Sequence, residues 1–375
     1  MEGEALTAAR ALLPLIANLR DETENGRRLP SKLVDALRAA GLCRLAIPPV
    51  EALQVYELLA GAEASVAWIV WNNALPCFFG RFLPADSREE IFGNDDWLYA
   101  SSTRPSGRAA LEGDRYRVNG RWSLVSGCEL AEWLALRCAV EENGQPRMLA
   151  PNVPEVRMMW VRRSEVEILD TWHTGGLRGT GSHDVVLADL VVPRRHSISP
   201  LDGSNLPGAR GRVPIVCNMA AGYGAQLLGM AQAAIDTLVA LSTTKAVVDP
   251  GPPIGERPQV LGAIAEHRNR VAAAREHLHS RVAGLWAAAE TGRASREQIA
   301  AVFGAAHHAM AEARATVSAM YALAGASALY TSSPLERAHR DMHAMAAHVI
   351  AQRLWLEDTS RVMFGREPLN PMYLV

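Results

Sequence analysis

The spacing of apolar residues divides the chain into three stretches. In residues 1–95, leucine, isoleucine and alanine recur at steps of three and four positions, as they do on one face of a helix. Pro48 and Pro49 interrupt this pattern. It predicts four helices, over residues 6–19, 31–42, 51–63 and 65–82.

Residues 96–205 carry a different pattern. Short apolar runs are separated by turn signals such as Glu112-Gly113-Asp114 and Asn119-Gly120. Pro193 and the Gly/Pro-rich stretch over residues 201–214 end this pattern. The strand-like runs cover residues 99–101, 116–118, 134–136, 166–169 and 185–192, so a β domain is expected here.

Residues 206–375 return to a helical pattern that is rich in alanine. Small residues on long antiparallel helices favour a bundle, because they let helices approach closely within or between subunits. A loop that contains Asp249-Pro250-Gly251-Pro252-Pro253 follows the first of these helices. The predicted helices cover residues 219–242, 259–291, 296–326 and 334–364.

Charge and composition exclude several classes of protein. The 375 residues include 38 Lys and Arg against 40 Asp and Glu, without a basic block, so no nucleic-acid partner is expected. The apolar run 131–140 contains Glu132 and Arg137, so no membrane span is expected. The start Met1-Glu2-Gly3-Glu4 lacks the pattern of a secretory signal, which predicts a cytoplasmic protein. Five scattered cysteines without a C-x-x-C pair argue against a disulfide framework or a zinc ribbon.

Three segments carry candidate chemistry. The first is GRWSLVSG over residues 120–127, continued by Ala131-Glu132-Trp133. The second is DTWHTGGLRGTGSHD over residues 170–184, which leads into Val191-Val192-Pro193. The third comprises Gly325-Ala326-Ser327, Ser333 to Arg337, Arg340 to His343, and His348.

Together these segments resemble the flavin-dependent monooxygenases built on the acyl-CoA dehydrogenase fold, over nearly the whole chain and in the same order. That family includes two-component hydroxylases of phenols, steroid-degradation intermediates, indole-acetate-like compounds and dibenzothiophene, and nitrososynthases of aminosugars. The resemblance implies an α+β fold that is mostly α. Its parts are an N-terminal helical domain (1–95), a middle β-barrel domain (96–205) and a C-terminal four-helix bundle (206–375).

Ser126 is the candidate of the first segment. A small hydroxyl beside Gly127 lets a planar ring approach the backbone, and Ser126 would be placed to donate a hydrogen bond to flavin N5 or to a peroxide on the adjacent carbon. The alternative is a serine that satisfies a turn at the strand end. Ser101 and Ser102 are implied by the resemblance to hold the flavin pyrimidine edge. The following Arg104-Pro105 departs from the dehydrogenase form, which leaves the contacting hydroxyl open.

The second segment is expected to touch the flavin. A strand pattern follows its glycines, so it is not a phosphate loop that opens a helix. Its backbone and the hydroxyls of Thr180 and Ser182 would contact the isoalloxazine ring or the phosphate tail. Trp172 would stack on a flavin face or, alternatively, lie in the β-domain core. His173 and His183 are interpreted as turn or surface residues.

The third segment separates two chemistries. An acyl-CoA dehydrogenase needs a carboxylate base, in many members a glutamate about eight residues after an Arg-Asp pair. Here Arg340-Asp341 is followed by His348, and no carboxylate occurs before Glu357. The resemblance implies that His348 faces the flavin and handles protons, for which an imidazole that titrates near neutrality is suited. A core histidine is the alternative.

Helix spacing adds three expectations. Asp341 and His348, seven residues apart, would share a helix face, and Arg337 would pair with Asp341 to fix that helix. His339 and His343 could face a metal, but no third ligand is evident, so no metal site is expected.

The helix over residues 65–82 resembles the one that lines the substrate pocket in this fold. Its candidates are Trp68, Asn72 and Asn73, with the alternative that either asparagine faces water. The family also carries a longer loop with a Gly-Gly pair after the position of Pro49, and its lack here implies a different access or substrate class.

The resemblance therefore implies a monooxygenase that acts on a small aromatic or polycyclic substrate through a C4a-flavin hydroperoxide. FAD or FMN would arrive reduced from a separate flavin reductase, since no nicotinamide site is visible, and O2 would be the second substrate. A homotetramer or homodimer is expected. The alternatives are an acyl-CoA dehydrogenase-like oxidase or dehydrogenase, an atypical biosynthetic flavoenzyme for oxidative rearrangement or cyclisation, and a non-catalytic flavin-binding homologue.

Overall fold

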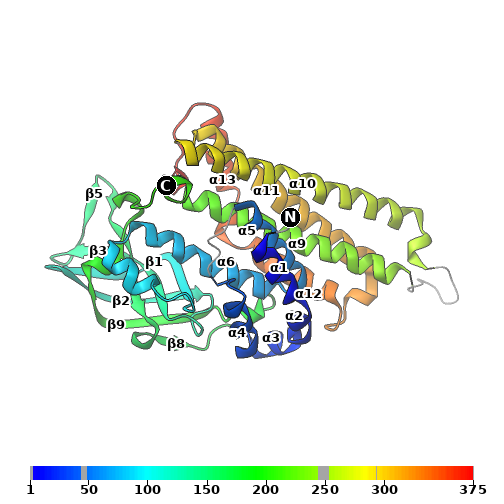
Figure 1. Ribbon diagram of the computed structural model, residues 1–375, viewed down its shortest axis with the longest axis horizontal. Coiled ribbons are helices and arrows are strands. Elements are labelled where there is room, and N and C mark those ends of the chain that lie inside the picture. Colours follow the sequence, from blue (N-terminus) through cyan, green and yellow to red (C-terminus); the bar gives the residue numbers. More distant parts are fainter. Residues whose placement is uncertain (1–2, 44–48, 244–252, 293, 375) are drawn as a thin grey trace.

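The computed structural model describes residues 3–43, 49–243, 253–292 and 294–374. Figure 1 shows the strands gathered at one end of the molecule and three long helices that run side by side away from them. The N-terminal helices pack between these two parts. The expected α+β fold with mostly helical content is confirmed, while the domain boundaries at residues 95 and 205 stay predictions.

Seven helices and a single 3-10 turn form the N-terminal part that the structure describes. The expected helix over residues 6–19 is broken after Ala11, because Pro14 has no N–H to continue the helical hydrogen bonds. The expected helix over residues 65–82 is one residue longer at its start and ends in the 3-10 turn. The helices are α1 (Glu4–Ala11), α2 (Leu13–Asn18), α3 (Arg20–Gly26), α4 (Ser31–Ala39), α5 (Pro49–Ala62), α6 (Ala64–Phe79) and α7 (Ala85–Phe92).

Eight strands of the middle part form one sheet. The order along the sheet is β10-β7-β3-β1-β2-β9-β8, with β4 on the edge of β3, and β5 and β6 form a separate hairpin. Three of the predicted runs, 99–101, 116–118 and 134–136, cover only the beginnings of longer strands, the runs 166–169 and 185–192 match β8 and β9 closely, and β7 was missed. The strands are β1 (Tyr99–Glu112), β2 (Arg115–Val125), β3 (Trp133–Glu142), β4 (Gln145–Pro146), β5 (Met148–Ala150), β6 (Val153–Pro154), β7 (Val156–Arg162), β8 (Glu167–Leu169), β9 (His183–Pro193) and β10 (Ser197–Ile198).

The C-terminal part packs around α9. The close approach of α5 to α9 needs glycine, since a Cβ on Gly229 would overlap the carbonyl oxygen of Glu57. The expected helix over residues 334–364 is wrong as a single element, because it is two helices joined by a 3-10 turn. Residues 249–252 of the expected loop lie outside the described residues. The helices are α8 (Gly208–Arg212), α9 (Ile215–Ser242), α10 (Pro258–Thr291), α11 (Arg296–Ala324), α12 (Pro334–Ala346) and α13 (Leu354–Met363).

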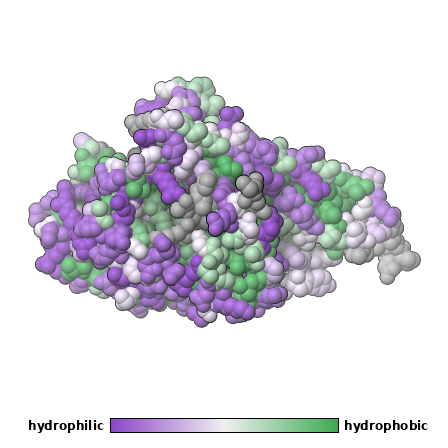
Figure 2. Space-filling view, in the orientation of Figure 1, coloured by the Kyte–Doolittle hydropathy of each residue, from purple (hydrophilic) through white to green (hydrophobic). Residues whose placement is uncertain are grey.

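The expectation that no segment reaches membrane-spanning length overlooked α9. Residues 215–235 carry no charge, and α9 is long and apolar enough to cross a bilayer by length and composition alone. In the fold, however, α9 is mostly buried against α5 and α11, as a core helix is. Figure 2 shows that hydrophilic residues cover most of the visible face of the molecule.

Candidate active site

A cavity of about 300 Å³ opens where α6, the end of β2, the loop 172–182 and the segment after α12 meet. The structure brings eight of the ten predicted site residues to its wall, and the other two, Asn73 and Thr180, lie behind it. The eight are Trp68, Asn72, Ser101, Ser102, Ser126, Trp172, Ser182 and His348. Residues that are far apart in sequence thus form one site.

The face of α6 toward the cavity holds Ser126 in place. Trp68 and Asn72 are four residues apart and therefore on one side of the helix. The Trp68 indole Nε1–H donates to Ser126 Oγ at 2.9 Å, and Asn72 Nδ2 donates to the Ser126 carbonyl oxygen at 3.2 Å. Both the side chain and the backbone of Ser126 are thereby anchored by the substrate-side helix.

Asn73 does not line the substrate pocket as predicted but bonds to buried backbone groups. Its Nδ2 donates to the carbonyl oxygen of Cys43, and its Oδ1 accepts from the backbone N–H of Tyr99 at 2.5 Å. The side chain is 2% exposed, so it satisfies buried backbone groups of α6's neighbours instead of facing the cavity. These two hydrogen bonds link α6 to Cys43 and to the start of β1 and offset the free-energy cost of burying the Asn73 side chain.

A row of hydroxyls continues behind Ser126. Ser126 Oγ lies 2.7 Å from Ser182 Oγ, and Ser182 Oγ lies 2.7 Å from Thr180 Oγ1. Thr180 Oγ1 donates to the Leu177 carbonyl oxygen at 2.8 Å. The row is buried, with Thr180 at 2% exposure.

The loop 172–182 is held mainly by its own backbone and by α12. The Trp172 indole Nε1–H donates to the carbonyl oxygens of Leu177 and Arg178, both at 3.1 Å, and the Leu177 N–H donates to Asp341 Oδ1 at 2.6 Å. A Cβ on Gly176 would press on the Arg340 backbone. A Cβ on Gly179 would meet side chains of α3 and α6. These two glycines therefore allow close packing of the loop against α12, α3 and α6.

His183 is a loop anchor that the sequence did not reveal. It is 5% exposed, and its Nδ1 accepts from the N–H groups of Thr171 and Trp172 at 3.2 and 3.3 Å. His173 is exposed, as expected. The interpretation of His183 as a turn or surface residue is therefore wrong as to its burial.

His348 stands among aromatic rings. Its ring stacks on Tyr223 with centroids 5.4 Å apart and meets Trp68 edge-on at 5.5 Å. Burial in this cage, with a smaller contribution from the positive charge of Arg104, lowers the pKa of His348 to about 4. The expectation that this imidazole titrates near neutrality is therefore wrong. Its Nδ1 accepts from the Ile350 N–H at 3.2 Å, so the neutral ring carries its proton on Nε2.

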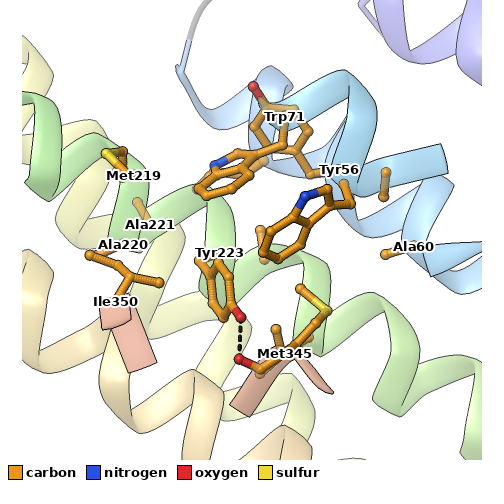
Figure 3. Close-up of a cluster of buried hydrophobic side chains, with 14 of the residues drawn as sticks. Tyr56, Ala60, Trp71, Met219, Ala220, Ala221, Tyr223, Met345 and Ile350 are labelled. Atoms are coloured by element: carbon orange, nitrogen blue, oxygen red, sulfur yellow. Dashed lines mark hydrogen bonds between the residues drawn. The ribbon is translucent and has the colours of Figure 1, made fainter. Parts of the chain in front are cut away.

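The segment that presents His348 is not helical, which overturns two expectations. The α12 helix ends at Ala346, because the Tyr223 hydroxyl and the His348 N–H take the Met345 carbonyl that would otherwise continue the helix (Figure 3). Asp341 and His348 therefore do not share a helix face. Arg337 pairs with Asp21 at 3.0 Å and Glu63 at 3.4 Å, not with Asp341.

The electrostatic character of the cavity follows from its lining. Arg104 is the one side chain of fixed charge among the described lining residues, and no carboxylate is among them. Asp341 points at Leu177, and burial together with the nearby Glu63 carboxylate raises its pKa. Glu357 is exposed on α13. Within the described part of the chain, no carboxylate base of the dehydrogenase type faces the cavity.

Arg104, Leu124 and Val349 are among the lining residues that were not predicted as site residues. Leu124 adopts the left-handed conformation with φ 61° and is 51% exposed at the end of β2, while Val349 is 50% exposed beside His348. Arg104 was noted in the sequence only as a departure from the dehydrogenase pattern. No periodicity distinguishes any of them, because their position depends on how the strand end and the α12 terminus meet.

Fold and cavity together define an acyl-CoA dehydrogenase-type flavoenzyme scaffold. Residues 221–353 match the family "Acyl-CoA dehydrogenase, C-terminal domain". The chain superimposes on XiaF from Streptomyces sp., a structure in complex with FADH2 and glycerol, with a TM-score of 0.90 and 24% identity over 98% of this chain and 96% of that one.

Sequence relatives narrow this class. The oxygenase subunit HsaA of a flavin-dependent monooxygenase from Rhodococcus jostii is 30% identical, over 90% of this chain and 92% of the relative. Indole-3-acetate monooxygenase from Pseudomonas putida is 26% identical, over 99% of this chain and 97% of the relative. The chain belongs to the oxygenase components of the reduced-flavin-dependent monooxygenases that have the acyl-CoA dehydrogenase fold.

Proposed function

We propose that this protein hydroxylates a small aromatic or polycyclic substrate in the described cavity. One observation carries the proposal. A wall of tryptophan rings and a neutral histidine faces a row of hydroxyls, and no carboxylate lies among the described lining residues. Such a lining suits flat, largely apolar molecules with a few polar edges. It does not suit the removal of an acyl α-proton, which needs a base.

The residues present fit a flavin. The tricyclic ring has apolar faces and a polar edge, and the cavity offers the matching surfaces. Trp172 would cover a face, and the hydroxyls of Ser101, Ser102, Ser126 and Ser182, at 8%, 5%, 6% and 4% exposure, would meet the edge. When bound, reduced FAD or FMN supplies the electrons that activate dioxygen for transfer of one oxygen atom to the substrate.

His348 would act as a hydrogen-bond donor and not as a general base. With a pKa of about 4 the ring is neutral at physiological pH, and with Nδ1 engaged by Ile350 its Nε2–H is the group left for a reacting oxygen. The surrounding rings of Trp68 and Tyr223 hold the imidazole in place. Its role is thus to hold a proton at a fixed place throughout the reaction.

The substrate side is proposed to be α6. Asn72 uses its amide nitrogen on Ser126, which leaves its oxygen to accept from a phenolic hydroxyl or an indole N–H. Arg104 would attract a carboxylate or phenolate group at the cavity mouth. The name of the Pseudomonas putida relative, indole-3-acetate monooxygenase, supports an aromatic substrate.

The proposed monooxygenase function also implies which proteins this chain would associate with. An oxygenase subunit that uses reduced flavin needs a flavin reductase, and the name of the HsaA relative, an oxygenase subunit, supports this partner. The alanine-rich helices α9 to α11 favour self-association as a homodimer or homotetramer.

The proposal is tested by single turnovers with chemically reduced FAD or FMN, 18O2 and a panel of indoles and phenols with and without a carboxylate. One 18O atom is expected in the product of at least one aromatic compound. The variant H348Q should lose most product, whereas H307Q, which alters a buried histidine of α11 with a similarly lowered pKa of about 4, should keep it. Bleaching of bound oxidised flavin by an acyl-CoA, with no 18O in any aromatic product, would contradict the proposal.

A further inference from the structure

The hydroxyl row behind the cavity has a fixed direction. Oxygen atoms 2.7 to 2.8 Å apart need one proton between them, because two facing lone pairs repel at that distance. The Leu177 carbonyl can only accept, so the single proton of Thr180 points to it.

The rest of the row follows by counting protons. The contact between Thr180 and Ser182 must then use the proton of Ser182, and the contact between Ser182 and Ser126 must use the proton of Ser126. Trp68 Nε1–H can only donate, and it donates to Ser126. Every hydrogen bond therefore runs in one direction, from Trp68 through Ser126, Ser182 and Thr180 to the Leu177 carbonyl.

This direction reverses the role expected for Ser126. Ser126 and Ser182 line the cavity, and their protons are engaged within the row, so each presents a lone pair to a ligand. Thr180, which terminates the row, does not line the cavity. A ligand atom that carries a hydrogen is thus favoured at Ser126 over one that carries a lone pair.

We propose that Thr180 is a positioning residue that, through Ser182, fixes Ser126 as a hydrogen-bond acceptor and makes the site prefer reduced over oxidised flavin. N5 of a reduced flavin bears a hydrogen that Ser126 can accept, whereas N5 of an oxidised flavin offers a lone pair. The inference rests on the proposed function. It gives the oxygenase a means to take up reduced flavin from a reductase and to release the spent, oxidised form.

The variant T180V tests the direction of the row. Valine keeps the shape of threonine, and the Leu177 carbonyl keeps two donors, the Thr180 backbone N–H and Trp172 Nε1–H, so no buried group loses its last partner. The Ser182 proton then turns to Ser126, and the Ser126 proton becomes free for the cavity. The ratio of dissociation constants, oxidised over reduced, should fall about tenfold, the value of one hydrogen bond.

Two measurements give this ratio without turnover. Anaerobic fluorescence titration yields the dissociation constants of both redox states. The midpoint potential of the bound flavin should fall by about 30 mV, because a tenfold change in a two-electron equilibrium corresponds to that value. The control T180S keeps the row and should retain the wild-type ratio. T359V removes a buried hydroxyl of α13 that bonds to the Trp355 carbonyl, and it should also retain the ratio.

The outcomes are distinct. An unchanged ratio in folded T180V overturns the inference, as does wild-type protein that binds both redox states equally. If T180V does not fold, S182A removes the acceptor of the Ser126 proton and must shift the ratio in the same direction. Failure of wild-type protein to bind flavin in either state overturns the proposed function as well.

Discussion

Replacing His348 by glutamine should flatten the dependence of stability on pH. In the folded protein burial lowers the pKa of His348 to about 4, whereas an unfolded chain has the ordinary value of about 6.5. Between these values the unfolded state binds more protons, so the free energy of unfolding falls as pH falls. The stabilisation is present in full above pH 6.5 and is lost progressively toward pH 4.

The size of the effect follows from the two pKa values. At pH 5 the unfolded imidazole is almost fully protonated and the folded one is mostly neutral, which lowers the free energy of unfolding by about 2 kcal/mol relative to pH 7.5. Wild-type protein should therefore lose about 2 kcal/mol more than H348Q between these two pH values. H307Q should show a similar difference, because burial also lowers the pKa of His307 to about 4.

Urea unfolding followed by tryptophan fluorescence at pH 7.5 and pH 5.0 measures these differences. The double variant H307Q/H348Q should lose the least stability of the four proteins, since the two histidines lie on different elements. An equal loss in wild type and H348Q would mean that His348 is solvated and charged at pH 5. The proposed role as a neutral donor would then fail, and product formation would show an inflection near pH 6.5.

Two further predictions concern the scaffold. The variant G229A should lose about 3 kcal/mol or more of unfolding free energy, because the new methyl group overlaps the backbone of α5. The control G262A lies on the open face of α10 and should be neutral or gain up to about 1 kcal/mol. Thermal unfolding compares the stability of the two variants. The variant D341A should weaken flavin binding and speed proteolysis of the loop 172–182, because the Leu177 N–H loses its acceptor. The control D341N keeps an acceptor oxygen, so its flavin binding and proteolysis rate should stay near those of wild type. Equal behaviour of D341A and D341N would contradict this anchoring role.

The sequence predicted the fold through long, strongly periodic elements. The helices α9, α10 and α11 were found nearly to their ends, because many residues on each repeat the same pattern. Strand β7 was missed, since its residues Val156–Arg162 mix charged and apolar side chains without clean alternation. The break after Ala346 was missed as well, because it depends on a tertiary contact with Tyr223 that lies 122 positions away.

The site was predicted by residue type better than by role. Eight residues meet at one cavity, yet the asparagine pair illustrates the limit. Asn72 and Asn73 are adjacent, and only the direction of α6 decides that one faces the cavity and the other the Cys43 carbonyl. The pKa of His348 and the direction of the hydroxyl row depend on burial and on distances between segments, which the order of residues does not contain.

The origin of the cavity wall has a consequence for biosynthesis. Its residues come mainly from four segments in chain order, which are α6, the strands β1 and β2, the loop 172–182 and the segment at His348. During translation the first three can fold while the fourth is still inside the ribosome. Flavin capture is therefore expected only after the segment at His348 has also been synthesised and folded, so a product stalled before it would have no complete site in which to trap a reactive reduced flavin.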